Sequence, residues 1–166
     1  MRRLLILVLV LAAGCRGAMT EAEYGAAFKA ECERYHAKAK EIAARPWPKM
    51  KGFTKEERRK ALAQKVREDS KVYAELSDDF KKLRAPQAYE GLQKAYQEFL
   101  DGQLRINNAY ALAIESNDSE GARLRNDEFV AFLQSQMNVV LDEIGKAGGD
   151  VGKLKKDMEA FFRENR

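Results

Sequence analysis

Proline placement sets the strongest limit on the fold of this chain. All three prolines of the 166-residue sequence lie between residues 46 and 86, so long stretches on both sides contain no residue that must break a helix. Those stretches are rich in Ala, Leu, Glu, Lys, Gln and Arg, which have the strongest helix preferences. No stretch shows the sustained alternation of apolar and polar residues that is typical of a strand. The sequence therefore predicts an all-α fold.

The first predicted helix runs from Thr20 to Arg45. Thr20 and Glu23 form a capping box, a pairing that marks the beginning of a helix. The helix ends at Arg45 because Pro46 disfavours helical backbone in the residue before it. Its apolar positions recur at steps of three and four and so share one face, which consists of Tyr24, Phe28, Cys32, Tyr35, Ala39 and Ile42.

A second capping box, Thr54 with Glu57, predicts the beginning of the next helix. The apolar stripe of this helix keeps a heptad register that is interrupted near Asp69 and Ser70, and it consists of Leu62, Val66, Tyr73, Leu76, Phe80 and Leu83. The sequence Arg84-Ala85-Pro86 then predicts a tight stop and restart. The proline is expected in a first helical position, where its missing N–H is not needed.

The third predicted helix has one polar interruption, Gln103, and ends at Asn117-Asp118, a pair that favours a turn and can cap the next helix. Its apolar residues are Tyr89, Leu92, Tyr96, Phe99, Ile106, Tyr110 and Ala113. The fourth predicted helix runs to about Ala147, where Gly148-Gly149 closes it as a glycine C-cap. Its apolar residues are Phe129, Leu133, Met137, Val140 and Ile144.

A short fifth helix is predicted after Asp150, with an apolar side made of Val151, Leu154, Met158, Phe161 and Phe162. Basic residues surround the two phenylalanines, which suits either an interfacial helix on anionic lipid or a helix docked on the rest of the fold. The four longer helices have similar lengths and short connections. They predict an antiparallel up-down four-helix bundle, with the short fifth helix at its C-terminus, over residues 20–166.

The N-terminus has the three parts of an export signal, in the usual order. Met1-Arg2-Arg3 is positively charged, residues 4–11 are all apolar, and Ala12-Ala13-Gly14 places small residues directly before Cys15. The apolar run is too short to span a bilayer, since a spanning helix needs roughly 20 apolar residues.

The end of this signal, Ala12-Ala13-Gly14-Cys15, resembles the lipobox of bacterial lipoproteins. In that family a peptidase cuts directly before a cysteine whose sulfur carries a diacylglyceryl group. The resemblance implies a lipoprotein signal peptide over residues 1–14, a lipidated tether over residues 15–19 and a lipid on Cys15. Ala12 departs from the pattern, which usually has a larger apolar residue there. The alternative is an ordinary signal peptide followed by an unrelated cysteine.

The lipobox, the Leu-Arg-Ala-Pro break at residues 83–86 and the Asn117-Asp118 turn together resemble the small helical-bundle lipoproteins of bacteria. This resemblance implies the bundle fold and a location in the cell envelope, and it assigns no functional residue. Lipoprotein sorting retains chains with Asp after the cysteine at the inner membrane. Arg16 therefore implies the periplasmic face of the outer membrane.

Charge and cysteine usage narrow the possible partners. Removing residues 1–14 takes away two arginines and no acidic residue, so the formal net charge falls from +4 to +2. Both signs are interspersed, which gives no electrostatic case for nucleic-acid binding. Because a lipid occupies the sulfur of Cys15, Cys32 is predicted to be unpaired, either as a small buried apolar residue or as an intermolecular partner.

A lipid on Cys15 also predicts which end of the bundle faces the membrane. Four residues separate Cys15 from Thr20 and reach at most about 14 Å. An upright first helix rises about 39 Å, so the loop over residues 46–53 is expected at the far end. Trp47, the only tryptophan, and Phe53 are predicted partner contacts in this loop. The alternative is that both rings fold back and close the end of the core.

Residues that could carry chemistry are few. Glu33 and His36 have the Glu-x-x-His spacing of di-iron bundles, but that site needs the motif twice and His36 is the only histidine. Cys32 and His36 are four residues apart and would need a second chain or borrowed carboxylates to complete a zinc or copper site. The sequence contains no Cys-x-x-Cys-His haem motif, no Gly-x-Ser-x-Gly turn and no Gly-rich phosphate or dinucleotide loop.

These features favour a non-enzymatic interaction or scaffold module of the cell envelope, anchored by lipid and contacting an unknown envelope protein. No catalytic residue, metal site or cofactor is predicted. One alternative is a bundle that binds a small ligand, a metal or haem, with Cys32, His36, Asp69 and Gln103 as the candidate residues. Another is a periplasmic envelope-stress chaperone.

Overall fold

The computed structural model of the chain describes residues 19–148. This part forms four long α-helices, α2 (Glu21–Ala44), α3 (Lys55–Phe80), α4 (Glu90–Glu115) and α5 (Ser119–Lys146), with a short 3-10 helix, η1 (Gln87–Tyr89), before α4. No strand occurs between residues 19 and 148, so the all-α prediction is confirmed there. The predicted signal peptide, Cys15 and the predicted fifth helix lie outside the described residues.

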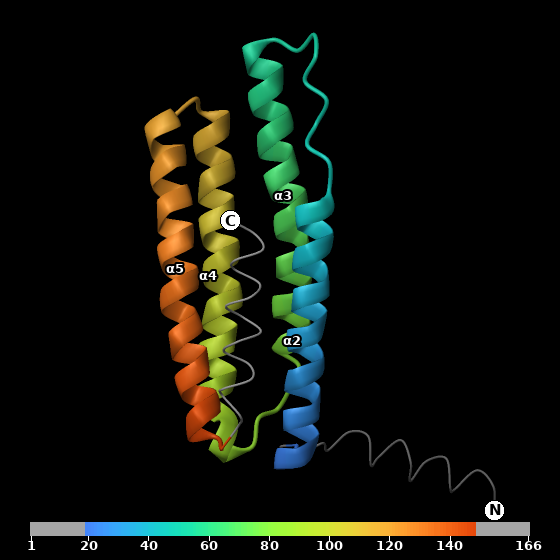
Figure 1. Cartoon of the computed structure of the whole chain (residues 1–166), viewed down its shortest axis with the longest axis vertical. Coiled ribbons are helices and arrows are strands. Elements are labelled where there is room, and N and C mark those ends of the chain that lie inside the picture. The colour runs from blue at the N-terminus through green and yellow to red at the C-terminus, as the bar shows by residue number, and fades with distance from the viewer. Residues whose placement is uncertain (1–18, 149–166) are drawn as a thin grey trace, which may run out of the picture.

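The four helices lie side by side and alternate in direction along the chain (Figure 1). α4 packs extensively against both α3 and α5, and α2 packs against α3. We call one end of the bundle the base, where α2 begins, α3 turns into α4 and α5 ends. The opposite end, with the α2–α3 loop and the α4–α5 turn, is the tip. The predicted four-helix bundle is therefore present in the described residues.

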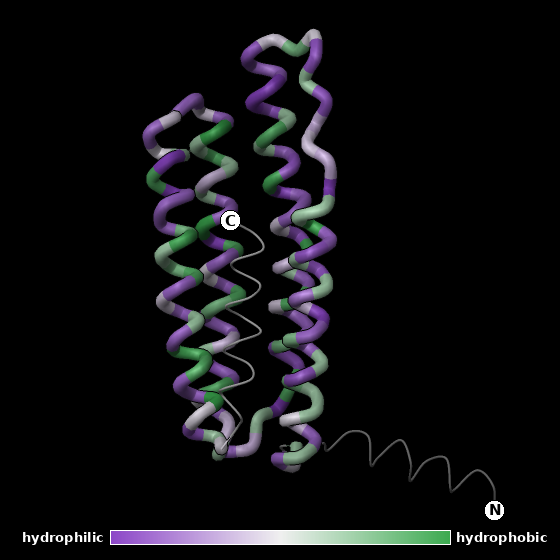
Figure 2. The backbone as a smooth tube through the Cα atoms, in the orientation of Figure 1, coloured by the Kyte–Doolittle hydropathy of each residue, from purple (hydrophilic) through white to green (hydrophobic). Residues whose placement is uncertain are grey.

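Aromatic rings from three helices form much of the core. Phe28 of α2, Phe80 of α3 and Tyr96 of α4 contact one another edge to face, with ring centroids 4.7–6.0 Å apart. Such pairs stabilise a fold by about 0.5–1.5 kcal/mol beyond the burial of their area. Apolar residues recur along every helix between hydrophilic ones (Figure 2). Other members of the buried cluster are Tyr24, Leu92, Ala95, Phe99, Leu100, Val140 and Ile144.

The predicted caps are confirmed. Both capping boxes are complete, at Thr20 with Glu23 and at Thr54 with Glu57. Asn117 has a left-handed backbone with φ of 60°, and the next residue, Asp118, accepts a bond from a backbone N–H of α5. Gly148 also has a left-handed backbone, as a glycine C-cap requires. Side-chain chemistry in the sequence therefore sets these helix ends.

The turn between α3 and α4 differs from the prediction in the position of Pro86. Pro86 does not occupy a first α-helical position, because its backbone is extended and the 3-10 helix η1 separates it from α4. Gln93 explains this geometry: its side chain accepts a bond from the Ala85 N–H and donates one to the Leu83 carbonyl. These two bonds fix the turn in an extended path, so α4 begins four residues later, at Glu90.

None of the described helices is both long enough and apolar enough to cross a membrane.

Candidate functional site

The loop between α2 and α3 lies at the tip, as the sequence predicted (Figure 1). Arg45, directly after α2, bonds to Asp69 of α3 at 3.1 Å. Asp69 lies 14 residues after Lys55, the first residue of α3, so α3 begins about 21 Å beyond the end of α2. Residues 46–53 run beside this projecting part of α3 (Figure 1). The loop and the first turns of α3 therefore form an exposed projection.

Trp47 lies on the side of this projection. Its side chain is 66% exposed, and the ammonium group of Lys65 lies 5.1 Å from the centre of its ring. Phe53, at the other end of the loop, is 40% exposed. Neither ring closes the end of the core, so the alternative in which both fold back is wrong. A cation over the indole face contributes about 0.5–1 kcal/mol at such a site and holds the ring in place.

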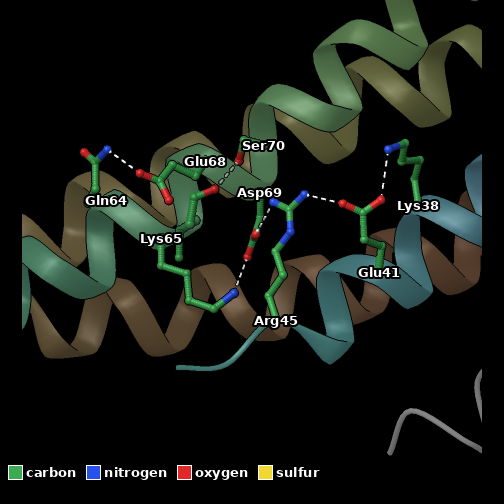
Figure 3. Close-up of polar contacts among 9 residues, drawn as sticks. Lys38, Glu41, Arg45, Gln64, Lys65, Glu68, Asp69 and Ser70 are labelled. Carbon is green, nitrogen blue, oxygen red and sulfur yellow. Dashed lines mark hydrogen bonds and ion pairs between the residues drawn. The ribbon is translucent and has the colours of Figure 1, made fainter. Parts of the chain in front are cut away.

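A chain of charged groups fixes the lower end of the loop (Figure 3). Asp69 accepts from Arg45 and, at 2.6 Å, from Lys65. Arg45 also donates to Glu41 at 2.8 Å, and Glu41 accepts from Lys38 at 2.9 Å. The bonds from Arg45 and Lys38 hold the pKa of Glu41 down at about 2. The side chains of Lys65 and Asp69 are only 12% and 15% exposed, so this pair is the best shielded part of the network.

The upper end of the loop is fixed by the beginning of α3. The Thr54 N–H donates to the Glu57 carboxylate at 2.7 Å, and the Thr54 hydroxyl accepts from the Glu57 N–H at 3.2 Å. Arg58 donates through Nε to the carbonyl of Phe53 at 3.1 Å. Gly52 supplies the left-handed backbone of the turn, with φ of 87°. Both ends of the loop are therefore held by specific bonds to α3.

Positive charge is concentrated here, in contrast to the even distribution expected from the whole sequence. Residues 45–60 hold seven basic and two acidic residues, whereas the chain as a whole has a net charge of +4. With partners in residues 19–148, the basic residues of this segment that form ion pairs are Arg45 and Lys60. Within residues 19–148 no carboxylate pairs with the three lysines between them, Lys49, Lys51 and Lys55. The beginning of α3 adds the positive end of a helix dipole to the same place.

The projection is also joined to the rest of the tip. Arg59 donates to the side chain of Asn117, in the α4–α5 turn, at 2.9 Å. About two turns further along α3, Arg67 makes a two-pronged ion pair with Glu115 at the end of α4. We define the tip surface as the exposed side chains Trp47, Lys49, Lys51, Phe53, Lys55 and Arg58. The bonds of Arg59 and Arg67 to the α4–α5 turn and the end of α4 hold the tip surface in a fixed position on the bundle.

The candidate metal ligands Cys32 and His36 do not belong to a larger group of possible ligands in the described residues. Cys32 is partly buried against the aromatic core, and burial raises the pKa of its thiol to about 12. His36, one turn further along α2, is exposed. Between residues 19 and 148 no three Cys, His, Asp or Glu side chains are placed to hold a metal ion. In the described residues, Cys32 and His36 are therefore not part of a group of three or more candidate ligands.

The other two ligand candidates are engaged in bonds within the protein. Asp69 belongs to the charged network at the tip. Gln103, only 2% exposed, accepts a bond from the Tyr35 hydroxyl at 3.1 Å. Ser77 is another buried polar residue, and the sequence pattern did not predict its role. Its hydroxyl donates to Asp101 at 2.6 Å, which joins α3 to α4.

The hollows in the described part of the chain are small or open. One of about 220 Å³ lies between the helices near Asp69 and is also lined by Ile42, Tyr73, Tyr110 and Phe129. This volume is below the roughly 300–1,000 Å³ that is usual for a ligand site. Another, of about 380 Å³, lies near the base, is wide open to solvent and is lined by Leu83 and Ala85 together with polar residues that include the exposed Lys94 and Glu98. The tip surface is therefore the better candidate site.

The sequence predicted Trp47 and Phe53 as partner contacts, and the structure shows both to be exposed, but the sequence did not predict the residues that position them. Lys65 lies 18 residues after Trp47, and Asp69 lies 24 residues after Arg45, so no local spacing rule connects them. The excess of basic residues between 45 and 60 is visible in the sequence, but an average over the whole chain hides it.

Comparison of the chain with models of protein families, with curated proteins and with solved structures found no match.

Proposed function

We propose that this chain is a bacterial lipoprotein whose helical bundle acts as a non-enzymatic interaction or scaffold module of the cell envelope. In this proposal residues 1–14 are a signal peptide and Cys15 carries the lipid. The proposed location is the periplasmic face of the outer membrane. The tip of the bundle then faces away from the membrane and contacts another envelope protein.

The geometry of the base supports the anchoring part of the proposal. The Met19 N–H donates to the Arg84 carbonyl at 3.0 Å, which fixes Met19 at the turn between α3 and α4. Met19 is only four residues after Cys15, a distance of at most about 14 Å. A lipid on Cys15 would therefore keep the base of the bundle close to the bilayer surface.

One observation carries the interaction part of the proposal: Trp47 and Phe53 are exposed at the end of the bundle farthest from Met19. Exposed aromatic rings held in fixed positions are typical of the residues that dominate protein interfaces. The internal polar groups support a structural role for the bundle itself, because Ser77 with Asp101 and Tyr35 with Gln103 join one helix to another.

The predicted fifth helix fits this arrangement as a further element at the base. Gly148, with its left-handed backbone, ends the described chain at the base of the bundle. In the proposal, the helix that follows either docks on the bundle or lies on anionic lipid.

The serine variant Cys15→Ser tests the proposal. We expect the native chain to incorporate a labelled fatty acid and to remain in the membrane fraction after a salt wash. The variant should lose the label and no longer be held in the membrane by lipid, because a serine oxygen does not replace the acylated sulfur. Cys32→Ser is the matched control and should keep both properties. Lipid labelling that persists in Cys15→Ser would exclude Cys15 as the anchor.

A further inference from the structure

The tip surface differs from the rest of the molecule in charge. Residues 45–60 carry a net charge of +5, so the remaining 150 residues together carry a net charge of −1. Glu56 pairs with Lys60 and Glu57 caps α3, so neither acidic residue neutralises the lysines of the loop. The uncompensated charge on this molecule is therefore concentrated at one end.

This concentration of charge opposes folding. Lys55 and Arg58 lie in the first turns of α3, where the helix dipole favours acidic side chains and disfavours basic ones. Lys49 and Lys51 add like charges in the adjoining loop, and like charges that lie close together repel. Stability therefore gives no reason for this arrangement, whereas attraction of an acidic partner does.

The aromatic residues of the tip surface are positioned before any partner binds. Lys65 covers one face of the Trp47 ring and is itself held by Asp69. At Phe53 the backbone is held, because its carbonyl accepts a bond from Arg58. A side chain that is already ordered loses little entropy on binding, which favours an interface.

The tip surface is elongated along α3 and is not confined to the very end of the bundle. Trp47 lies beside Lys65, ten residues along α3 from Lys55, whereas Phe53 lies next to the start of that helix. The two rings are therefore about 15 Å apart along the axis of α3, and Lys49 and Lys51 lie between them in the sequence. A flat bilayer that met the tip end-on would reach Phe53 and leave Trp47 in water. An elongated segment lying along α3 can contact both rings.

From these observations we propose that the tip surface binds a segment of another protein that is rich in Asp and Glu and carries apolar side chains. The carboxylates bond to Lys49, Lys51, Lys55 and the outer nitrogens of Arg58, and the apolar side chains pack against Trp47 and Phe53. This inference rests on the proposed function and specifies the chemistry of the partner. Anionic lipid is the competing class, and the experiment below separates the two.

The single tryptophan gives a direct signal, because all indole fluorescence comes from Trp47. The full chain is reconstituted into phosphatidylcholine vesicles and titrated with a synthetic helical peptide that carries Glu and Leu on one face. We expect saturable binding that shifts the Trp47 emission to shorter wavelength. A peptide with Gln in place of every Glu should bind at least about tenfold more weakly. Raising the salt concentration from about 50 to about 200 mM should weaken binding of the Glu peptide.

Two triple variants show where the peptide binds. Lys49→Gln with Lys51→Gln and Lys55→Gln should weaken binding at least about tenfold. The matched control replaces Lys29, Lys71 and Lys94 with Gln, which removes the same charge from exposed positions on the helices away from the tip surface. The control should bind within about twofold of the native chain, because its cations lie outside the tip surface.

Three outcomes would overturn the proposal. The first is no binding of the Glu peptide, and the second is equal affinity for the Glu and Gln peptides. The third is a shift of the Trp47 emission without peptide when about 30% phosphatidylglycerol replaces phosphatidylcholine, which would make anionic lipid the partner. None of these outcomes affects the lipid anchor, which Cys15→Ser tests separately.

Discussion

At the scale of single residues, two tyrosines that pack in the core, Tyr24 and Tyr35, differ in whether their hydroxyl groups form a hydrogen bond. Tyr24 is 0% exposed, and its hydroxyl has no hydrogen-bond partner among residues 19–148, although its ring packs on Phe28 and Tyr89. Tyr35 also packs against the core, but its hydroxyl donates to the buried Gln103. A buried polar group without a partner costs about 1–3 kcal/mol, whereas a satisfied one contributes modestly to stability.

Replacement of these tyrosines by phenylalanine should therefore change stability in opposite directions. Tyr24→Phe removes an unsatisfied hydroxyl and should raise the free energy of unfolding by about 1 kcal/mol. Tyr35→Phe leaves the Gln103 oxygen without its donor and should lower it by about 1–2 kcal/mol. Urea unfolding followed by circular dichroism measures both. Equal destabilisation by the two substitutions would show that the Tyr24 hydroxyl has a partner.

At the scale of helices, the contact between α4 and α5 depends on a glycine. A Cβ atom added at Gly102 would lie 2.1 Å from the ring of Phe132, far inside van der Waals contact. The ring of Phe132 stacks on that of Phe99, with centroids 6.5 Å apart, so it is held from the other side. Close approach, rather than backbone conformation, therefore explains a glycine inside α4.

Alanine substitution separates this packing effect from helix preference. In an open helical position, Gly→Ala stabilises by up to about 1 kcal/mol. Gly25, in α2, has no atom within 4 Å of an added Cβ, so Gly25→Ala should be stabilising. Gly102→Ala should instead lower the free energy of unfolding by about 1–3 kcal/mol, because Phe132 must move. If thermal unfolding shows both variants to be stabilised alike, the two helices are not in close contact at Gly102.

The helix ends and the connections between helices show how far the sequence alone could predict the fold. The helix ends at Thr20, Thr54 and Gly148 were predictable because capping chemistry is local. The extended backbone of Pro86 was not, because it depends on bonds from Gln93, seven residues further along. The exposure of Trp47 depends on the path of a whole loop, so the sequence left two alternatives open there.

At the scale of the whole molecule, the two ends of the bundle have different characters. The base joins Met19 to the α3–α4 turn, a few residues from the proposed lipid on Cys15. The tip presents, at the opposite end, exposed aromatic rings and lysines that pair with no carboxylate of residues 19–148. α2 alone separates these ends by about 36 Å, from its 24 residues. A bundle held by lipid at its base would therefore display its tip well away from the bilayer surface.

Depth-dependent quenching of Trp47 tests this arrangement most directly. The protein is recovered from bacterial membranes and reconstituted into vesicles. If lipid on Cys15 holds the base and the tip points away, aqueous iodide should quench the Trp47 emission strongly. Brominated phospholipid, which quenches only indoles that reach the acyl region, should leave that emission unchanged. Strong quenching by brominated lipid with protection from iodide would place Trp47 at the membrane and contradict the account.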